Sequence, residues 1–128
     1  METIAHIRTG FSEKFGIPRQ SGLVPAAKGR IFFEKQYRNP DAIRGIEEFS
    51  HLWLIWGFSA NKEKKSSLLV NPPRLGGKEK RGVFATRSPF RPNGLGLSSV
   101  VIEKIEIDKK YGSVIWVSGV DMLDNTPI

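Results

Sequence analysis

One segment of the 128-residue chain concentrates residues that recognise anions. Positions 87–94 read Arg-Ser-Pro-Phe-Arg-Pro-Asn-Gly, so Arg87 and Arg91 lie in a segment stiffened by two prolines. An arginine presents a planar fork of donors that fits a carboxylate or a phosphate. A plain connection between two strands would not need two arginines and an aromatic residue among prolines. The pattern therefore favours an anion-binding loop over a surface turn.

A second segment, residues 18–22, offers donors of another kind. Its sequence Pro-Arg-Gln-Ser-Gly combines an amide and a hydroxyl side chain with the backbone N–H groups of an ordered loop. For proton transfer the only candidate is His51, and it is a weak one, because a lone histidine at a strand start is more often a hydrogen-bonded structural residue. No nucleophile triad, carboxylate pair or Walker loop is recognisable, so the catalytic residue stays unassigned.

The charge of the chain is concentrated in one stretch. The sequence holds 20 Lys and Arg against 13 Asp and Glu, a net charge of +7. Residues 62–91 contain nine basic residues and two acidic ones, so this stretch carries all of the excess and the rest is neutral. Prolines, glycines and aromatic residues lie among these cations, which is typical of a surface that binds a polyanion, with nucleic acid as the first candidate. A solvated loop kept soluble by lysines is the less informative alternative.

Composition excludes several classes of protein. The chain has no cysteine and only two histidines, which argues against a disulfide scaffold and against a metal site. No apolar run approaches the roughly 20 residues that span a bilayer, and the N-terminus lacks an apolar signal core. We therefore expect a cytoplasmic protein with no membrane and no metal partner.

The hydrophobic pattern predicts a mainly β protein of one domain, residues 1–128. Asn39, Pro40 and Asp41 form a helix-start signature, and the apolar residues that follow predict one short amphipathic helix. The apolar run 50–58 predicts a central, buried strand. Strands at short spacing with one helix favour a small single-sheet antiparallel β-barrel. The other expected strands cover residues 3–9, 27–34, 97–107 and 113–118, with a β-prone stretch at 83–86.

Two glycines invite a competing interpretation of the fold. Gly94 and Gly96 could begin a dinucleotide-binding loop, which requires a third glycine and a following helix. Ser99 stands where the third glycine would be, and the β-branched residues 100–102 favour a strand. We therefore expect no Rossmann fold and place these glycines at the mouth of a strand.

Four segments together resemble the TsaA/TrmO family, namely residues 15–22, 49–53, 72–77 and 82–93. The last of these, Gly-Val-Phe-Ala-Thr-Arg-Ser-Pro-Phe-Arg-Pro-Asn, is long enough to be highly specific. The resemblance covers the chain from about Ile4 onward. It implies an S-adenosylmethionine-dependent tRNA methyltransferase that works as a homodimer and has a β-barrel fold. The implied reaction is N6-methylation of threonylcarbamoyl-adenosine in the tRNA anticodon loop.

The resemblance also implies site residues, motif by motif. The pair Ser59 and Ala60 departs from the polar pair often found after that strand, so contact there is expected through the backbone. Arg87 is expected to hold the cofactor carboxylate, and Asp121 the sulfonium, the ammonium or the ribose. The implied S-adenosylmethionine contacts are Gln20, Ser21, Gly22, Ser59, Ala60, Arg87, Leu97, Ser118, Gly119, Val120 and Asp121. Candidates for tRNA contact are Arg74, Lys78, Lys80, Arg81 and Arg91.

Two alternatives stay open from the sequence. A non-catalytic β-barrel module that binds RNA or a nucleotide would share most of these features. The family pattern commonly continues past the Asp-Asn-Thr-Pro segment at 124–127, whereas this sequence ends at Ile128. We therefore expect the domain to lack the C-terminal end of the family core.

Overall fold

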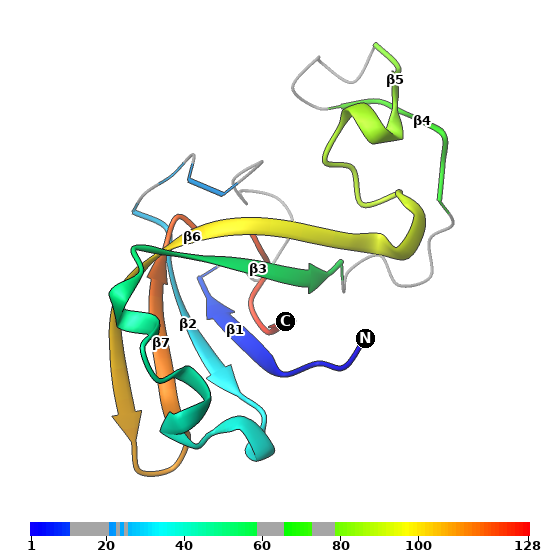
Figure 1. Cartoon of the computed structure of the whole chain (residues 1–128). Helices are drawn as coiled ribbons and strands as arrows, with labels where there is room; N and C mark the ends of the chain where they lie inside the picture. The colour runs from blue at the N-terminus through cyan, green and yellow to red at the C-terminus, as the bar shows by residue number, and fades with distance from the viewer. Residues whose placement is uncertain (11–20, 23, 25, 59–65, 73–78) are drawn as a thin grey trace.

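The chain is built around one antiparallel sheet of six strands. The computed structural model describes residues 1–10, 21–22, 24, 26–58, 66–72 and 79–128. The strands lie in the order β3-β6-β7-β2-β1-β8, and β3 also contacts β8, so the sheet is nearly closed (Figure 1). The expected antiparallel barrel is therefore confirmed. The strands are β1 (Ala5–Thr9), β2 (Lys28–Phe33), β3 (His51–Gly57), β6 (Leu95–Asp108), β7 (Gly112–Ser118) and β8 (Thr126–Pro127).

Alternation of side chains decides which face of each strand is inside. In β1, Ala5 and Ile7 are buried while Arg8 points outward, and Ile7 pairs with Ile31 of β2. Ile7 and Ile115 are among the largest fully buried side chains of the barrel core. Burial of one such side chain stabilises a fold by about 1.5–3 kcal/mol. Packing of these side chains in the core therefore stabilises the strand order that positions the site.

The β6–β7 hairpin forms as the sequence predicts. Asp108 Oδ1 accepts hydrogen bonds from the backbone N of Lys110, at 2.7 Å, and of Tyr111, at 2.9 Å. Gly112 follows with a φ of 68°, and a Cβ there would lie 2.5 Å from the carbonyl oxygen of Arg38. An aspartate and a glycine at these two positions therefore fix the turn.

The prediction that residues 50–58 form a central, buried strand is wrong. Among the described residues, β3 is the last strand on one side of the sheet and pairs only with β6. Leu54 and Trp56 face the core, whereas Trp53 is 72% exposed and Ile55 is 50% exposed. An apolar composition is compatible with a strand that is covered on both faces. It does not show that other elements pack on the second face. In this chain the outer face of β3 stays open.

The helical segment begins where the sequence predicts. The Asn39 side chain accepts a hydrogen bond from Asp41 N at 2.9 Å, and Pro40 follows it. Two 3-10 helices, η2 (Pro40–Ile43) and η3 (Ile46–Glu48), then take the place of one continuous α-helix. Gly45 separates them with a φ of 88°, which a right-handed helix does not allow.

The described residues that follow β3 and precede β6 in the sequence form a small lobe that extends from the barrel. It contains β4 (Leu69–Val70), β5 (Arg81–Gly82), η6 (Val83–Ala85) and η7 (Pro92–Gly94), and Figure 1 shows it beyond one end of the sheet. The β-prone stretch at 83–86 therefore starts with a 3-10 helix and is not a strand.

A further 3-10 helix, η1 (Lys35–Tyr37), follows β2. Within the described part of the chain, no helix is long and apolar enough to cross a membrane.

Candidate functional site

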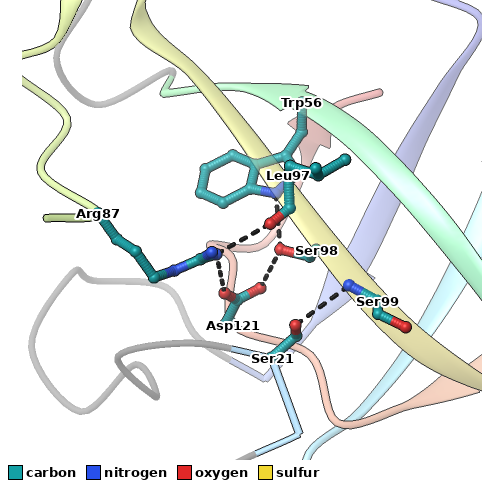
Figure 2. A network of polar contacts seen from close by, with 7 residues as sticks. All are labelled: Ser21, Trp56, Arg87, Leu97, Ser98, Ser99 and Asp121. Carbon is teal, nitrogen blue, oxygen red and sulfur yellow. Dashed lines mark hydrogen bonds and ion pairs between the residues drawn. The ribbon is translucent and has the colours of Figure 1, made fainter. Parts of the chain in front are cut away.

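Arg87 and Asp121 form an ion pair where the small lobe meets the barrel. Arg87 Nη2 lies 3.1 Å from Asp121 Oδ2 and donates a second hydrogen bond to the Leu97 carbonyl oxygen at 3.0 Å (Figure 2). The Asp121 side chain is only 3% exposed, whereas that of Arg87 is 44% exposed. The pair therefore joins a buried carboxylate to a cation that solvent can reach.

The second oxygen of Asp121 is held from inside the barrel. Ser98 Oγ donates to Asp121 Oδ1 at 2.6 Å, and Trp56 Nε1 donates to Ser98 Oγ at 2.9 Å. Both of these hydrogen bonds are buried. A buried carboxylate is tolerated only when its oxygens are hydrogen-bonded, and this chain of donors meets that need.

The register of β3 against β6 places Trp56 and Ser98 within reach of each other. Trp56 pairs with Gly96, two residues before Ser98. A Cβ on Gly96 would lie 2.4 Å from a Trp56 ring atom, closer than non-bonded atoms approach. Glycine is therefore required at position 96 for the indole to lie flat against β6 and reach Ser98.

A tight turn brings residues 21–22 beside the segment that carries Asp121. Gly119 has a φ of 77° and donates its N–H to the Ala27 carbonyl at 2.8 Å. Its own carbonyl accepts from Gly22 N at 2.9 Å. Ser21 Oγ accepts from Ser99 N at 3.1 Å, which ties the same segment to β6. Hydrogen bonds to β6 and to the residue that follows β7 therefore hold residues 21–22 against the site.

The expected cofactor residues come together as far as the structure describes them. The residues that lie around the Arg87–Asp121 pair are Ser21, Gly22, Leu97 and residues 118–120. Val120 is fully buried, so its side chain belongs to the core and its role there is structural. Gln20, Ser59 and Ala60 lie outside the described residues.

Of the expected tRNA contacts, Arg91 has a structural role. Its Nε donates to the Ser88 carbonyl at 3.1 Å, and its Nη2 contacts the carbonyl oxygens of Thr86 and Val83. With these donors engaged on backbone carbonyls, Arg91 braces the loop that carries Arg87. A contact of Arg91 with an RNA phosphate stays a prediction.

Two of the remaining basic candidates, Lys80 and Arg81, lie on the surface of the small lobe. Lys80 is exposed, and Arg81 pairs with Glu79 at 2.6 Å. Arg74 and Lys78 lie outside the described residues. The arrangement leaves Lys80 accessible to a polyanion, while Arg81 would have to exchange a surface ion pair of small energy.

His51 lies far from the Arg87–Asp121 pair. It begins β3, five residues before Trp56, which corresponds to about 16 Å along a strand. Its Nδ1 lies 2.7 Å from Ser50 Oγ, and the side chain is exposed. A general base must reach the reacting group directly or through one water, and the separation along β3 is longer than that reach.

Sequence reasoning missed Trp56 and Ser98. Trp56 lies in an apolar run that predicts only a core strand, and 42 residues separate it from Ser98. The signal that could have found Ser98 is alternation along β6. Gly96, Ser98 and Val100 all face inward, and a serine on a core face requires a partner.

The donor set fits a ligand with both a carboxylate and a cationic or hydroxyl group. Arg87 can turn its donors to a carboxylate, and Asp121 can accept from an ammonium or from ribose hydroxyls. Both already make these interactions with each other, so such a ligand would exchange one ion pair for two. Among the described residues, no group of three or more His, Asp or Glu could hold a metal ion.

Comparison with known proteins decides the family. The model of the tRNA-methyltransferase O N-terminal domain matches residues 6–128. The chain belongs to this TrmO family. It is 42% identical over 127 residues to the Escherichia coli tRNA (adenine(37)-N6)-methyltransferase, covering 99% of this chain and 54% of that protein. The human protein of the same name is 38% identical, with 99% of this chain and 28% of that protein covered.

Solved structures and a further relative agree with the TrmO assignment. The crystal structure of TrmO from Pseudomonas aeruginosa matches with a TM-score of 0.74 at 40% identity, covering 98% of this chain and 50% of that one. A Pseudomonas aeruginosa relative, 49% identical over 98% of this chain and 50% of its own length, is named as an S-adenosylmethionine-dependent methyltransferase. The chain thus spans about half the length of these bacterial relatives.

Proposed function

We propose that the chain transfers a methyl group from S-adenosylmethionine to N6 of threonylcarbamoyl-adenosine in the tRNA anticodon loop. The observation that carries this proposal is the convergence of Arg87, Leu97, Ser21 and Asp121 on one place. These are positions that the family resemblance connects with the cofactor, and they come from four separate segments. The names of the relatives support the reaction and the cofactor.

The residues of the site have separate tasks. When bound, S-adenosylmethionine supplies an electrophilic methyl group on a sulfonium. Arg87 donates to the carboxylate of the cofactor, and Asp121 accepts from its ammonium or its ribose. Ser98 and Trp56 keep Asp121 in place, and the backbone of Gly119 and Gly22 permits close approach of the ligand.

Positioning of the methyl donor and the acceptor nitrogen provides most of the catalysis. The N6 atom that receives the methyl group is amide-like and weakly nucleophilic, so alignment with the donor matters most. The base lies in a single-stranded loop and is reached by splaying it out, without opening a duplex. The described residues near Asp121 bind and orient, and the proton acceptor is left unassigned.

The chain acts as a homodimer in the cytoplasm in this proposal. Trp53 and Ile55 of β3 and Leu97 and Val101 of β6 leave apolar side chains exposed on neighbouring strands. An exposed apolar patch of this kind marks an association surface. A second copy of the chain would cover it and would bring another surface beside Leu97.

The experiment is methyl transfer to two otherwise identical tRNAs. The chain is incubated with methyl-labelled S-adenosylmethionine and a tRNA that either carries or lacks threonylcarbamoyl-adenosine. Label should enter only the modified tRNA, and digestion should place it on that nucleoside. Cofactor and RNA binding with no transfer would replace this proposal with a non-catalytic module. Label on the unmodified tRNA would contradict the proposed substrate.

A further inference from the structure

The outer face of the barrel carries a row of cations outside the basic segment 62–91. Arg8 of β1 pairs with Arg30 of β2, and both Arg30 and Lys104 of β6 pair with Trp116 of β7. The four side chains therefore form one row across four neighbouring strands. The Arg30 guanidinium lies 5.0 Å from the Trp116 ring centre, and Lys104 Nζ lies 4.5 Å from it. We call this row the cationic face.

A second group of cations continues the cationic face. The rings of Phe32 and Tyr111 meet edge to face at 5.2 Å. The Tyr111 ring is contacted by Arg38 at 5.7 Å and by Lys110 at 5.1 Å. Cations and aromatic rings thus alternate over the outer side of β2, β7 and the β6–β7 turn.

Acidic residues neutralise this face only in part. Asp124 pairs with Arg8 at 2.8 Å, and Glu106 accepts a hydrogen bond from Trp116 Nε1 at 2.8 Å. Within the described part of the chain, Arg30 and Lys104 form no ion pair. Two cations therefore lie beside one ring that has Glu106 at its Nε1 edge, and neither is in a direct ion pair among the described residues, an arrangement that an anion would stabilise.

Glu103, near this row, is already engaged with other groups. It pairs with Lys28 at 3.1 Å, and hydrogen bonds from Ser118 and Lys28 lower the pKa of its carboxyl below the usual value. Because Lys28 balances its charge, Glu103 offers little repulsion to an anion on the cationic face.

We propose that the cationic face binds the sugar–phosphate backbone of the RNA whose base enters the Arg87–Asp121 site, which rests on the function proposed above. The aromatic rings support the stems of Arg30 and Lys104, so less side-chain freedom is lost when they contact phosphates. Trp116 precedes Asp121 by five residues, at most about 18 Å of chain. An RNA strand that leaves the site can therefore cross this face.

A polymeric ligand fits better than a small anion. Figure 1 shows the small lobe beyond one end of the sheet, away from β2 and β7. Lys80 and Arg81 lie exposed on that lobe, so cations of the described residues lie on two sides of the site. A nucleic acid has phosphates at both places, whereas one small anion can meet only one of them.

The test replaces Arg30→Gln and Lys104→Gln together. The matched control, Arg44→Gln with Lys35→Gln, removes the same two residue types from exposed positions of the 3-10 segments. Affinity for a modified anticodon stem–loop RNA is measured by fluorescence anisotropy from low to high salt. The face variant should bind roughly 2- to 30-fold more weakly. Its slope of log affinity against log salt should fall by about 1.4–1.8, because two phosphate contacts are lost.

Three outcomes would overturn the proposal: no loss in the face variant, an equal loss in the control, or displacement by polyglutamate at least as effective as that by unlabelled RNA. The last outcome would indicate an acidic protein as the partner. Affinity for S-adenosylmethionine should be the same in both variants. If the unaltered chain transfers no methyl group, the proposed reaction fails, but the comparison of RNA affinities still decides whether this face binds RNA.

Discussion

Arg87 Nη2 lies 3.1 Å from Asp121 Oδ2, and this contact joins the small lobe to the segment between β7 and β8. The carboxylate is buried and held by Ser98, while the guanidinium is partly open to solvent. The rigid partner is therefore Asp121, and Arg87 is the one that can turn toward a ligand. A zwitterionic amino-acid group would find both of its counter-charges in this pair.

Arg87→Ala should remove most of the affinity for S-adenosylmethionine. A charge-assisted hydrogen bond contributes about 1.5–3 kcal/mol, so the dissociation constant should rise by roughly 10- to 150-fold. Calorimetric titration measures the change, and Arg44→Ala serves as an exposed control. RNA affinity should be nearly unaltered. Unchanged cofactor affinity in Arg87→Ala would place the cofactor elsewhere.

Ser98→Ala should act through Asp121. Loss of the Ser98 hydroxyl leaves Trp56 Nε1 and Asp121 Oδ1 without their buried partner, which costs about 1–3 kcal/mol of folding free energy. Its effect on cofactor affinity should be much smaller when Asp121→Asn is already present, because coupled residues are not additive. Ser113→Ala, which removes another buried serine, should leave affinity unchanged. Additive effects of the two site variants would show that Ser98 acts independently of Asp121.

The small lobe illustrates how much of the site the sequence predicts. The residue types and spacing of segment 87–94 predict an anion-binding loop, and the structure places Arg87 of this segment beside Asp121 and partly open to solvent. The same spacing could not distinguish Arg87 from Arg91, which binds carbonyls of its own loop. Both arginines lie within two residues of a proline, and only the folded structure shows that Arg91 donates to carbonyls of its own loop while Arg87 donates to Asp121 and to the Leu97 carbonyl.

The fold was predictable where strand alternation is regular. β1, β2, β6 and β7 lie close to their expected positions because apolar and polar residues alternate or cluster there. Two features were not predictable. The sequence does not show whether a second layer covers the outer face of β3, and it does not show that Gly45 adopts a left-handed conformation that divides the helical segment. The contact of Trp56 with Ser98 depends on the register of two distant strands.

Gly96→Ala should destabilise the fold and disturb the site together. The new methyl group would lie 2.4 Å from the Trp56 ring, so the indole must move away from Ser98. We expect a loss of about 1–3 kcal/mol in unfolding free energy, measured by denaturant titration. Gly57→Ala is the matched control because it lies in the adjacent pair of the same ladder with open space around its Cβ position. Equal stability of the two variants would contradict this packing account.

Asp124 should make the stability of the chain depend on acidic pH. Partial burial alone would raise its pKa, but hydrogen bonds from Arg8 and from Thr9 N outweigh that effect and hold the pKa of Asp124 below its usual value. Stabilisation from a depressed pKa is complete above the unfolded value of about 3.9 and is lost as pH falls through the folded value. The melting temperatures of the wild type and Asp124→Asn should therefore converge below about pH 4.

Thermal unfolding between acid and neutral pH tests the role of Asp124. Glu47→Gln removes a carboxylate from an exposed position and serves as the control, with a small and constant effect. A constant difference between wild type and Asp124→Asn at every pH would mean that the carboxylate contributes by packing and not by charge.

Ile55→Lys should weaken self-association. The charge would lie on the exposed apolar strip of β3 and β6, where a second copy would have to bury it. Sedimentation velocity should then show a shift from dimer to monomer. Ile107→Lys, at an exposed position near the far end of β6, should sediment like the wild type. A wild type that is monomeric at every concentration would contradict the dimer proposal.

A crystal structure of the chain with S-adenosylhomocysteine tests the central claim most directly. The account predicts the ligand carboxylate within hydrogen-bond distance of Arg87, and the ammonium or ribose hydroxyls within the same reach of Asp121. Ser98 and Trp56 should keep their places. A ligand bound at another surface, with the Arg87–Asp121 pair closed as it is here, would contradict the assignment of this site to the methyl donor.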